Sequence, residues 1–311
     1  AMSLPIEPPL LPQLARSRTS LPEGDDWAYE PKWDGFRAIA FVDGDDVYLQ
    51  SRNGKPLGRY FPEVLAGFPH GRYVLDGEIV AASFDTLGQR IHPAKSRIER
   101  LSVETPARFV AFDLLASGDE VLMERPWRER RDRLEAAALE GVELTPVVFT
   151  AADAAPWLEH EEGVIAKEAD EPYRPGERVG MVKVKRVRTI DAVVVGWRPG
   201  KAEGTAGALI LGLYEPDGRL REVGHSSGFT AKEKRELPAM MKPFETGERG
   251  SGEPSRWSAG RDLAWVALRP ELVVEVTFDH VSDGRIRHGA KVQRWRDDKD
   301  PGDCTVDQLD S

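Results

Sequence analysis

Residues 30–37 read Glu-Pro-Lys-Trp-Asp-Gly-Phe-Arg, a short polar segment between two apolar runs. Residues 27–29 before it predict the end of a strand, and residues 37–42 predict another strand that closes in an acidic turn at residues 43–46. Lys32 is therefore expected on a loop held by a sheet, where its amine can be aimed at a ligand. Because an isolated lysine is usually a solvated surface charge, the other segments of the chain decide between these two interpretations.

The composition is that of a globular protein. The 311 residues suit two domains or one large one, and the 40% of apolar residues supply a core. The one cysteine, Cys304, excludes a disulfide framework and a cysteine-ligated zinc site, and it is typical of a reducing cytosol. The sequence has no apolar run of membrane-spanning length and no signal-peptide pattern, so we expect a cytoplasmic protein without a membrane partner. The net charge of −10 limits any polynucleotide site to a local basic surface on an acidic body.

Strands and helices are mixed without a regular βαβ period in the first part of the chain, which favours an α+β fold with antiparallel sheets. In residues 126–140 arginines alternate with acids, so a solvated helix face is predicted there. Residues 73–81 predict two strands separated by an acidic kink at residues 76–78, where carboxylates are costly unless they are paired or liganded. The other predicted strands are residues 47–50, 108–115, 144–150, 163–166 and 181–185, and the other predicted helices are residues 60–68, 83–90 and 151–160.

A second domain is predicted to follow a joint near residues 186–189, which gives domains of residues 1–186 and 187–311. Short strands joined by glycine-rich turns, together with one helix, are what a small β-barrel of the oligonucleotide-binding (OB) type requires. The polar, Gly- and Ser-rich residues 245–261 predict a flexible loop. The predicted strands are residues 191–197, 208–214, 220–224 and 271–278, and the predicted helix is residues 230–241.

Seven short segments resemble, in the same order, the motifs of the ATP-dependent DNA ligases, which are covalent nucleotidyltransferases. The first is the Lys-x-Asp-Gly-x-Arg pattern of residues 32–37. The resemblance covers nearly the whole chain and is closest to the compact bacterial ligases of repair and end joining, of the stand-alone "ligase C" type. It implies a nucleotidyltransferase (adenylation) domain followed by an OB-fold domain. The other segments are residues 51–54, 75–78, 109–115, 162–167, 182–185 and 294–299.

The resemblance implies that Lys32 attacks the α-phosphate of ATP, expels pyrophosphate and carries AMP as a phosphoramidate. The AMP then passes to the 5′-phosphate of a DNA nick, and the 3′-hydroxyl displaces it to seal the strand. The carboxylates that the resemblance assigns to Mg²⁺ or Mn²⁺ are Asp34, Glu78 and Glu162. The implied nucleotide-binding residues are Glu30 and Phe112 for adenine, Arg37 and Glu78 for ribose and α-phosphate, Lys183 and Lys185 for the α-phosphate, Arg52 for the nick 5′-phosphate, and Arg294, Arg296, Asp298 and Lys299 for pyrophosphate.

The expected substrate is nicked or broken duplex DNA, bound by a monomer that works at the nucleoid. We expect no large DNA-encircling domain before residue 27, and the chain is acidic. We therefore expect the protein to make few contacts with DNA phosphates. A DNA end-binding protein or a repair polymerase would then raise sealing through the effective concentration of the break. Two alternatives stay open: an RNA ligase with the same chemistry, and a non-catalytic OB-fold nucleic-acid-binding scaffold. Glu30 beside the lysine argues against a capping enzyme, which transfers GMP.

Overall fold

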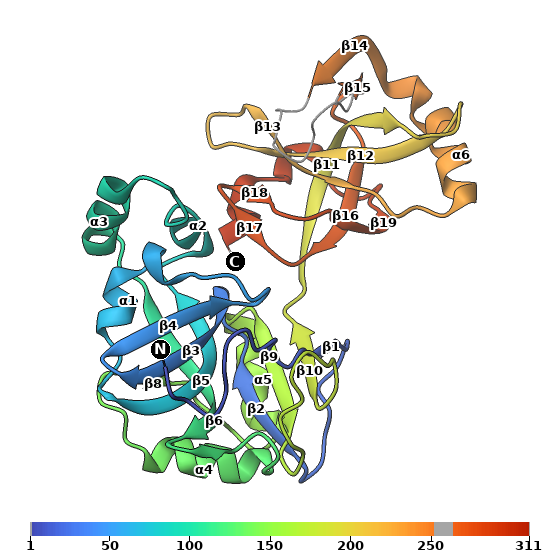
Figure 1. The fold of residues 1–311 in the computed structure, drawn as a ribbon. Helices are drawn as coiled ribbons and strands as arrows, with labels where there is room; N and C mark the ends of the chain where they lie inside the picture. The colour runs from blue at the N-terminus through green and yellow to red at the C-terminus, as the bar shows by residue number, and fades with distance from the viewer. Residues whose placement is uncertain (1, 252–263, 311) are drawn as a thin grey trace. The chain divides into compact units, whose positions relative to one another are not determined.

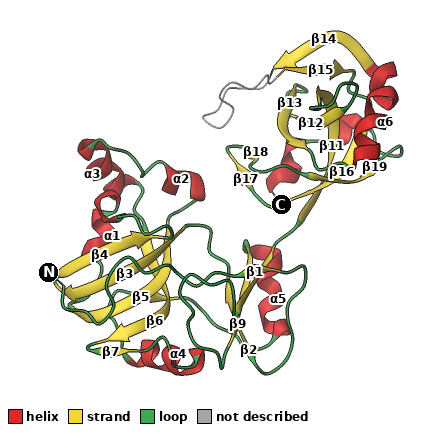
Figure 2. Cartoon of the chain, turned by 45° about the vertical axis from the view of Figure 1, so that its right-hand side comes forward, coloured by secondary structure: helices red, strands yellow, loops and turns green. Residues whose placement is uncertain are grey.

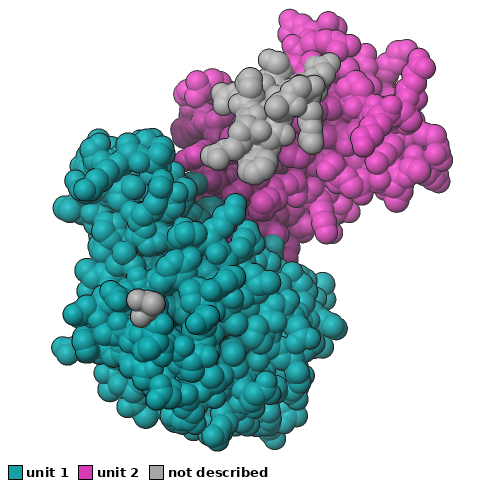
Figure 3. Space-filling model, in the orientation of Figure 1, with its two compact units in different colours: residues 1–186 teal, residues 187–311 magenta. Residues whose placement is uncertain are grey.

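The computed structural model describes residues 2–251 and 264–310. The chain forms two compact units, residues 1–186 (unit 1) and residues 187–311 (unit 2), which Figure 3 draws in different colours. Each unit has its own sheets and its own hydrophobic core. None of the helices within the described ranges has the length and the apolar character needed to cross a membrane.

Unit 1 is built on two sheets (Figure 1). The larger has the strand order β4-β3-β5-β6-β7 with β8 paired to β6, and the smaller has the order β1-β10-β9-β2. All pairs are antiparallel except β1 with β10 and β6 with β8, which confirms the predicted α+β class. The strands are β1 Arg16–Ser17, β2 Trp27–Pro31, β3 Phe36–Gly44, β4 Asp46–Ser51, β5 Gly71–Val80, β6 Arg108–Ser117, β7 Glu120–Val121, β8 Glu143–Leu144, β9 Gly163–Glu168 and β10 Met181–Lys185.

The helices of unit 1 flank these sheets, with α4 packed on β6 and α5 on β9 (Figure 2). Helix α5 has the predicted bounds because Thr150 caps its first turn, accepting a hydrogen bond from the Asp153 N–H at 3.1 Å. Helix α3 is not predicted from the sequence, because the residue before its first turn, Ala94, has no capping side chain and most of its ten residues are charged or polar. The helices are α1 Pro62–Ala66, α2 Phe84–Gly88, α3 Lys95–Glu104, α4 Trp127–Ala136 and α5 Ala151–His160.

The acidic segment of residues 76–78 does not interrupt its strand, so the prediction of two strands with a kink is wrong. β5 runs from Gly71 to Val80, and its pairing with β6 is irregular between Asp76 and Gly77. A Cβ atom on Gly77 would overlap the Val110 carbonyl oxygen, so only glycine fits this close approach of the two backbones. The strand stays continuous because Asp76 is buried in an ion pair with Arg37.

The strand predicted for residues 144–150 is also mostly absent. Pairing with β6 ends at Leu144, and beyond it only an isolated bridge joins Val148 to Tyr29. Pro146 lies between these two points, and a proline has no N–H to continue a ladder of hydrogen bonds. This proline therefore limits β8 to two residues.

Helix α4 has the predicted solvated face, at residues 128, 132, 135 and 136, but two of its arginines are buried. Arg130 is 2% exposed and makes two hydrogen bonds to the equally buried Asp113 of β6, Nε to Oδ1 at 2.8 Å and Nη2 to Oδ2 at 3.0 Å. Arg131 is 8% exposed. Alternation along the sequence does not reveal which arginines face the sheet, because the partner Asp113 is distant in the chain.

Unit 2 is a seven-stranded antiparallel arrangement with the order β13-β12-β11-β15-β14, in which β16 pairs with both β11 and β19. The prediction of a flexible loop at residues 245–261 is wrong for residues 245–251, which form β14 and pair with β15. Residues 252–263 lie outside the described ranges. The elements are β11 Arg188–Pro199, β12 Ala206–Tyr214, β13 Leu220–Ser226, α6 Ala231–Met241, β14 Glu245–Ser251, β15 Ala264–Leu268, β16 Val273–Phe278, β17 Val281–Ser282, β18 Arg285–Ile286 and β19 Lys291–Trp295.

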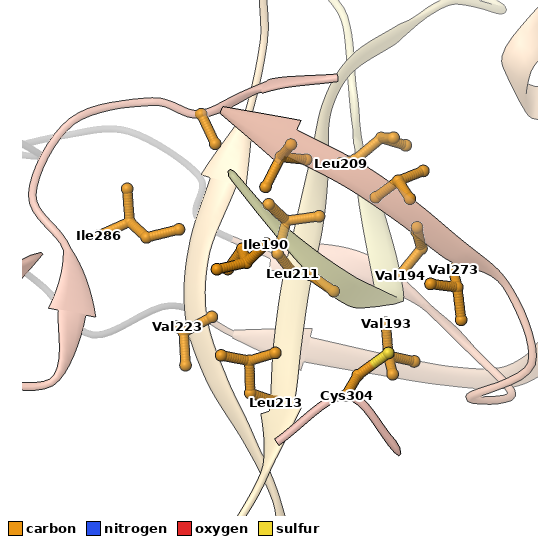
Figure 4. Close-up of a cluster of buried hydrophobic side chains, with 14 of the residues drawn as sticks. Ile190, Val193, Val194, Leu209, Leu211, Leu213, Val223, Val273, Ile286 and Cys304 are labelled. Carbon is orange, nitrogen blue, oxygen red and sulfur yellow. The ribbon is translucent and has the colours of Figure 1, made fainter. Parts of the chain in front are cut away.

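The core of unit 2 lies between these strands and α6. Aliphatic side chains of β11, β12, β13 and β16 meet there, and the thiol of Cys304 is buried among them (Figure 4). Burial raises the pKa of this thiol to about 11. Helix α6 begins with a capping box, in which Thr230 and Glu233 bond each other's backbone N–H groups.

The Arg130–Asp113 pair makes a prediction about stability. Arg130→Leu leaves a buried carboxylate without its partner and should lower the free energy of unfolding by about 3–5 kcal/mol. Arg133→Leu, on the same helix, removes an ion pair with Glu120 in which both side chains are about 40% exposed, and it should lower the free energy of unfolding far less. Urea unfolding of the full chain measures both shifts, and equal shifts would contradict the assignment of a buried pair.

Candidate active site

Unit 1 contains a cleft of about 600 Å³ whose walls come from both of its sheets. The loop of residues 32–35, the end of β2 and the start of β3 form one side; β5 and β6 contribute one residue each, and β9 and β10 contribute two each. Eight of the residues predicted from the sequence line the cleft: Glu30, Lys32, Asp34, Arg37, Arg52, Glu78, Phe112 and Lys183. The sequence segments that hold these residues are far apart, so the fold is what brings them together.

The register of the smaller sheet sets one wall. Residue Ile165 of β9 is paired with Glu30 of β2 on one side and with Lys183 of β10 on the other. These three residues therefore form a row across the sheet, and all three line the cleft. Because side chains alternate between the faces of a strand, a shift of one residue in either pairing would turn Glu30 or Lys183 away from the cleft.

The loop that carries Lys32 is held at both ends. The backbone N–H of Lys32 donates a hydrogen bond to the Gly163 carbonyl at 2.9 Å, just beyond the last pair of β2 with β9. At the other end, a Cβ atom on Gly35 would overlap the Ile79 carbonyl oxygen, so this position needs glycine for the loop to lie against β5. The side chain of Lys32 is half-buried in the cleft wall.

Arg37 is fixed by the first acid of the β5 segment. Its guanidinium makes two hydrogen bonds to Asp76, Nε to Oδ1 at 2.7 Å and Nη2 to Oδ2 at 2.6 Å, and Nη2 also donates to the Gln13 carbonyl at 2.9 Å. The Tyr173 hydroxyl donates to Asp76 Oδ2 at 2.8 Å. Burial opposes the charged form of Arg37, but Asp76, Tyr173 and Glu78 outweigh this effect and raise the pKa of Arg37. Asp76 is therefore committed to holding Arg37 in the wall.

Glu78, the second acid of that segment, has a different environment. It is paired with Arg37 across β5 and β3 and lines the cleft. Burial raises the pKa of Glu78 to about 7, against the lowering effect of Arg37 and Lys32. Of the two carboxylates, Glu78 is thus the one available to a ligand.

Glu30 lies at the inner part of the cleft beside a lysine that the sequence analysis did not single out. The Lys167 ammonium is 3.0 Å from Glu30 Oε2, and both residues are at most 5% exposed. The same ammonium lies 5.3 Å from the centre of the Phe112 ring, and the Arg37 guanidinium lies 5.7 Å from it. A carboxylate, an aromatic ring and two cations therefore meet at one place, which suits a heteroaromatic ring with polar edges.

Another part of the lining is basic. Burial lowers the pKa of Lys183, and the neighbouring cations Lys185, Arg178, Lys32 and Arg52 lower it further. Arg178 lines the cleft and was not predicted, because it lies in a turn-rich segment without a pattern; its Nη1 donates to the Ala15 carbonyl at 2.6 Å. A cluster of neighbouring cations of this kind is suited to a polyanionic ligand.

The remaining predicted residues do not line the cleft. Glu162 and Lys185 are not among its described lining residues, although a carboxylate oxygen of Glu162 lies within 4.8 Å of one of Asp34. The tail residues belong to unit 2, where Arg294 is paired with Glu275 at 3.2 Å. Arg296 is held by three carboxylates, and its hydrogen bonds lower the pKa of Asp298 to about 2. The three partners of Arg296 and their distances are Asp191 at 3.1 Å, Glu275 at 3.7 Å and Asp298 at 2.9 Å.

Comparison with known proteins gives matches along nearly the whole chain. The family profile "ATP dependent DNA ligase domain" matches residues 12–185, and "ATP dependent DNA ligase C terminal region" matches residues 202–299. The chain is 46% identical to DNA ligase C1 of Mycolicibacterium smegmatis over 100% of its length and 96% of that protein. It is 44% identical to DNA ligase C of Mycobacterium tuberculosis over 99% of its length and 96% of that protein.

Solved structures agree with these matches. The ligase domain of M. tuberculosis LigD is 30% identical, with a TM-score of 0.51, and the match covers 95% of this chain and 98% of that one. A Lig E DNA ligase at 19% identity shares the fold, with a TM-score of 0.57 over 92% of this chain and 99% of that one. Both domains of the chain and the order of its motifs are those of one family, and the chain belongs to the ATP-dependent DNA ligases.

Proposed function

We propose that this ligase seals nicks or breaks in duplex DNA by carrying AMP on Lys32. The observation that supports this most strongly is the cleft of unit 1, which gathers a lysine, an acid and an aromatic ring suited to a base, and a basic wall suited to phosphates. A related structure at 30% identity is described as mycobacterial DNA ligase D complexed with ATP, which supports ATP as the donor. Unit 1 would be the adenylation domain and unit 2 the OB-fold domain.

In the first step the neutral Lys32 amine attacks the α-phosphate of ATP. The nitrogen–phosphorus bond forms as the bond to the pyrophosphate oxygen breaks, and the amine loses its proton. Arg37, whose position is set by Asp76, and Lys183 stand in the cleft wall where they can stabilise charge on the phosphate oxygens. The base would stack on Phe112 and present its amino group to Glu30. When Glu30 is ionised, its carboxylate accepts hydrogen bonds and donates none.

The donor set fits a hard divalent cation. Asp34 and Glu78 both line the cleft, and carboxylate oxygens are what Mg²⁺ and Mn²⁺ prefer. Because burial holds the pKa of Glu78 near 7, a nearby cation would favour its ionised form. We propose that these two carboxylates, with Glu162, hold the ion. Its chemical contribution is to offset negative charge on the phosphates.

The later steps need DNA. Arg52 is exposed on the turn after β4 and lines the cleft, so it can take the 5′-phosphate that receives AMP. The tail residues Arg294, Arg296, Asp298 and Lys299 would act on the leaving pyrophosphate in the first step only. Arg296 already holds three carboxylates, so Lys299 is the cleaner test of that role.

The biological setting is also a proposal. A relative that is 35% identical over 87% of this chain is named a multifunctional non-homologous end joining protein of M. smegmatis. The name of this relative supports work on broken DNA. We propose in addition that the protein is a cytoplasmic monomer at the nucleoid, with a DNA end-binding protein or a repair polymerase as partner. The formal net charge of −10 supports such help, because few phosphate contacts give weak grip on DNA.

The first prediction concerns Lys32. With radiolabelled ATP and Mg²⁺ or Mn²⁺, the protein should acquire AMP at Lys32, and Lys32→Ala should abolish the label because the nucleophile is lost. Sealing of a pre-adenylated nick should survive, since that step does not use the amine. Lys95→Ala, which removes a lysine that is 90% exposed, is the matched control and should label normally. Peptide mapping that finds AMP on another residue would contradict the assignment.

The second prediction concerns Arg52. Arg52→Ala should form lysyl-AMP at the normal rate but transfer it to nicked DNA at least about tenfold more slowly, because a charge-assisted contact to phosphate is lost. Arg59→Ala, an exposed arginine that does not line the cleft, is the control. Normal transfer by Arg52→Ala would contradict the assignment of Arg52 to the nick 5′-phosphate. If the wild-type protein transfers AMP to nicked RNA instead of nicked DNA, an RNA ligase is favoured.

The third prediction concerns the tail. Lys299→Ala should slow self-adenylation at least about tenfold more than it slows the sealing of a pre-adenylated nick, because pyrophosphate leaves only in the first step. Lys291→Ala, an exposed lysine of β19 in the same unit, should change neither rate. Equal losses in the two assays would mean that Lys299 acts on DNA.

A further inference from the structure

The buried pair of Glu30 and Lys167 carries an inference about base selection, which rests on the function proposed above. We propose that Lys167 is a positioning residue that keeps the Glu30 carboxylate ionised, so that the cleft accepts adenine and rejects guanine. Lys167 need not touch the reacting atoms for this role. It would act through the charge of its neighbour.

The geometry isolates the pair from other partners. The Lys167 ammonium lies 3.0 Å from Glu30 Oε2, and the two side chains are 7% and 2% exposed. Glu30 Oε2 is buried and accepts no hydrogen bond from the described residues, so the ammonium is the contact that balances its charge. No other carboxylate of the described residues lies within ion-pair distance of Lys167. Both residues line the cleft beside Phe112.

The surrounding charges leave Lys167 as the main support of the carboxylate. Burial raises the pKa of Glu30, and Lys167 has the largest opposing effect. Arg131 of α4 also lowers the pKa, and Asp113 of β6 raises it by a smaller amount. Asp113 is itself paired with Arg130, which restrains its influence. Without Lys167, desolvation would favour the neutral carboxylic acid.

The charge of Glu30 decides which base edge it can meet. Adenine offers an amino group, a hydrogen-bond donor, where guanine offers the O6 acceptor. An ionised carboxylate accepts from the adenine amino group but opposes O6, so guanine would leave both groups unpaired. A protonated carboxyl can still accept from adenine and can also donate to O6. Loss of the charge would therefore remove the rejection of guanine while leaving adenine binding possible.

The experiment compares self-labelling rates with ATP and GTP in the full-length protein between about pH 6 and about pH 9. Near neutral pH, Lys167→Met should lower the preference for ATP over GTP at least about tenfold. The sign of the pH effect follows from linkage. Removing Lys167 raises the pKa of Glu30, so the carboxylate and the preference return only as the pH rises. Lys167→Arg keeps the charge and should restore the preference.

Two further variants separate charge from structure. Glu30→Gln is neutral at every pH and should lose the preference without recovering it at high pH. Lys95→Met removes one exposed lysine charge and should behave as wild type. If Lys167→Met does not fold, Lys167→Gln is measured in its place.

The outcomes are distinct. A wild-type preference in the neutral Lys167 variant at every pH would overturn the inference. So would equal slowing with both nucleotides, since that is what a merely structural lysine predicts. Failure of the proposed function itself gives another result, because the wild-type protein would then not label with ATP at all.

Discussion

The site of this ligase depends on the position of one strand, β9, between β2 and β10. The antiparallel pairing on both sides of Ile165 sets Glu30 and Lys183 at the same level of the sheet. β9 begins at Gly163, whose carbonyl accepts a hydrogen bond from the N–H of Lys32. The side chains proposed to read the base, to meet phosphate and to carry the nucleotide are thus placed by the pairings of this one strand.

Burial of charge is the second common feature of unit 1. Three carboxylates are almost inaccessible, and each lies beside its own cation: Glu30 with Lys167, Asp76 with Arg37, and Asp113 with Arg130. These pairs hold the strands that line the cleft. Such pairs add little net stability over apolar packing, but breaking one is costly. Glu78 lines the cleft with a pKa that burial raises, which suits a carboxylate that meets a ligand.

Local patterns predicted a large part of the fold. The alternation of residues 181–185 predicts β10, and the helix predicted for residues 151–160 matches α5. The predictions that failed concern residues whose partners are distant in the sequence. The polar residues 245–251 form a strand because β15 pairs with them, and Lys167 was passed over because nothing near it in sequence reveals Glu30 as its partner. The motifs located eight lining residues, whereas Arg178 needed the fold.

The central claim is that the cleft of unit 1 holds the nucleotide and that Lys32 carries it. The most direct test is a crystal structure of the full-length protein after incubation with ATP and a divalent cation. We expect continuous electron density from Lys32 Nζ to the phosphorus of AMP, with the base against Phe112 and its amino group at Glu30. Unmodified Lys32 with the nucleotide bound outside this cleft would contradict it.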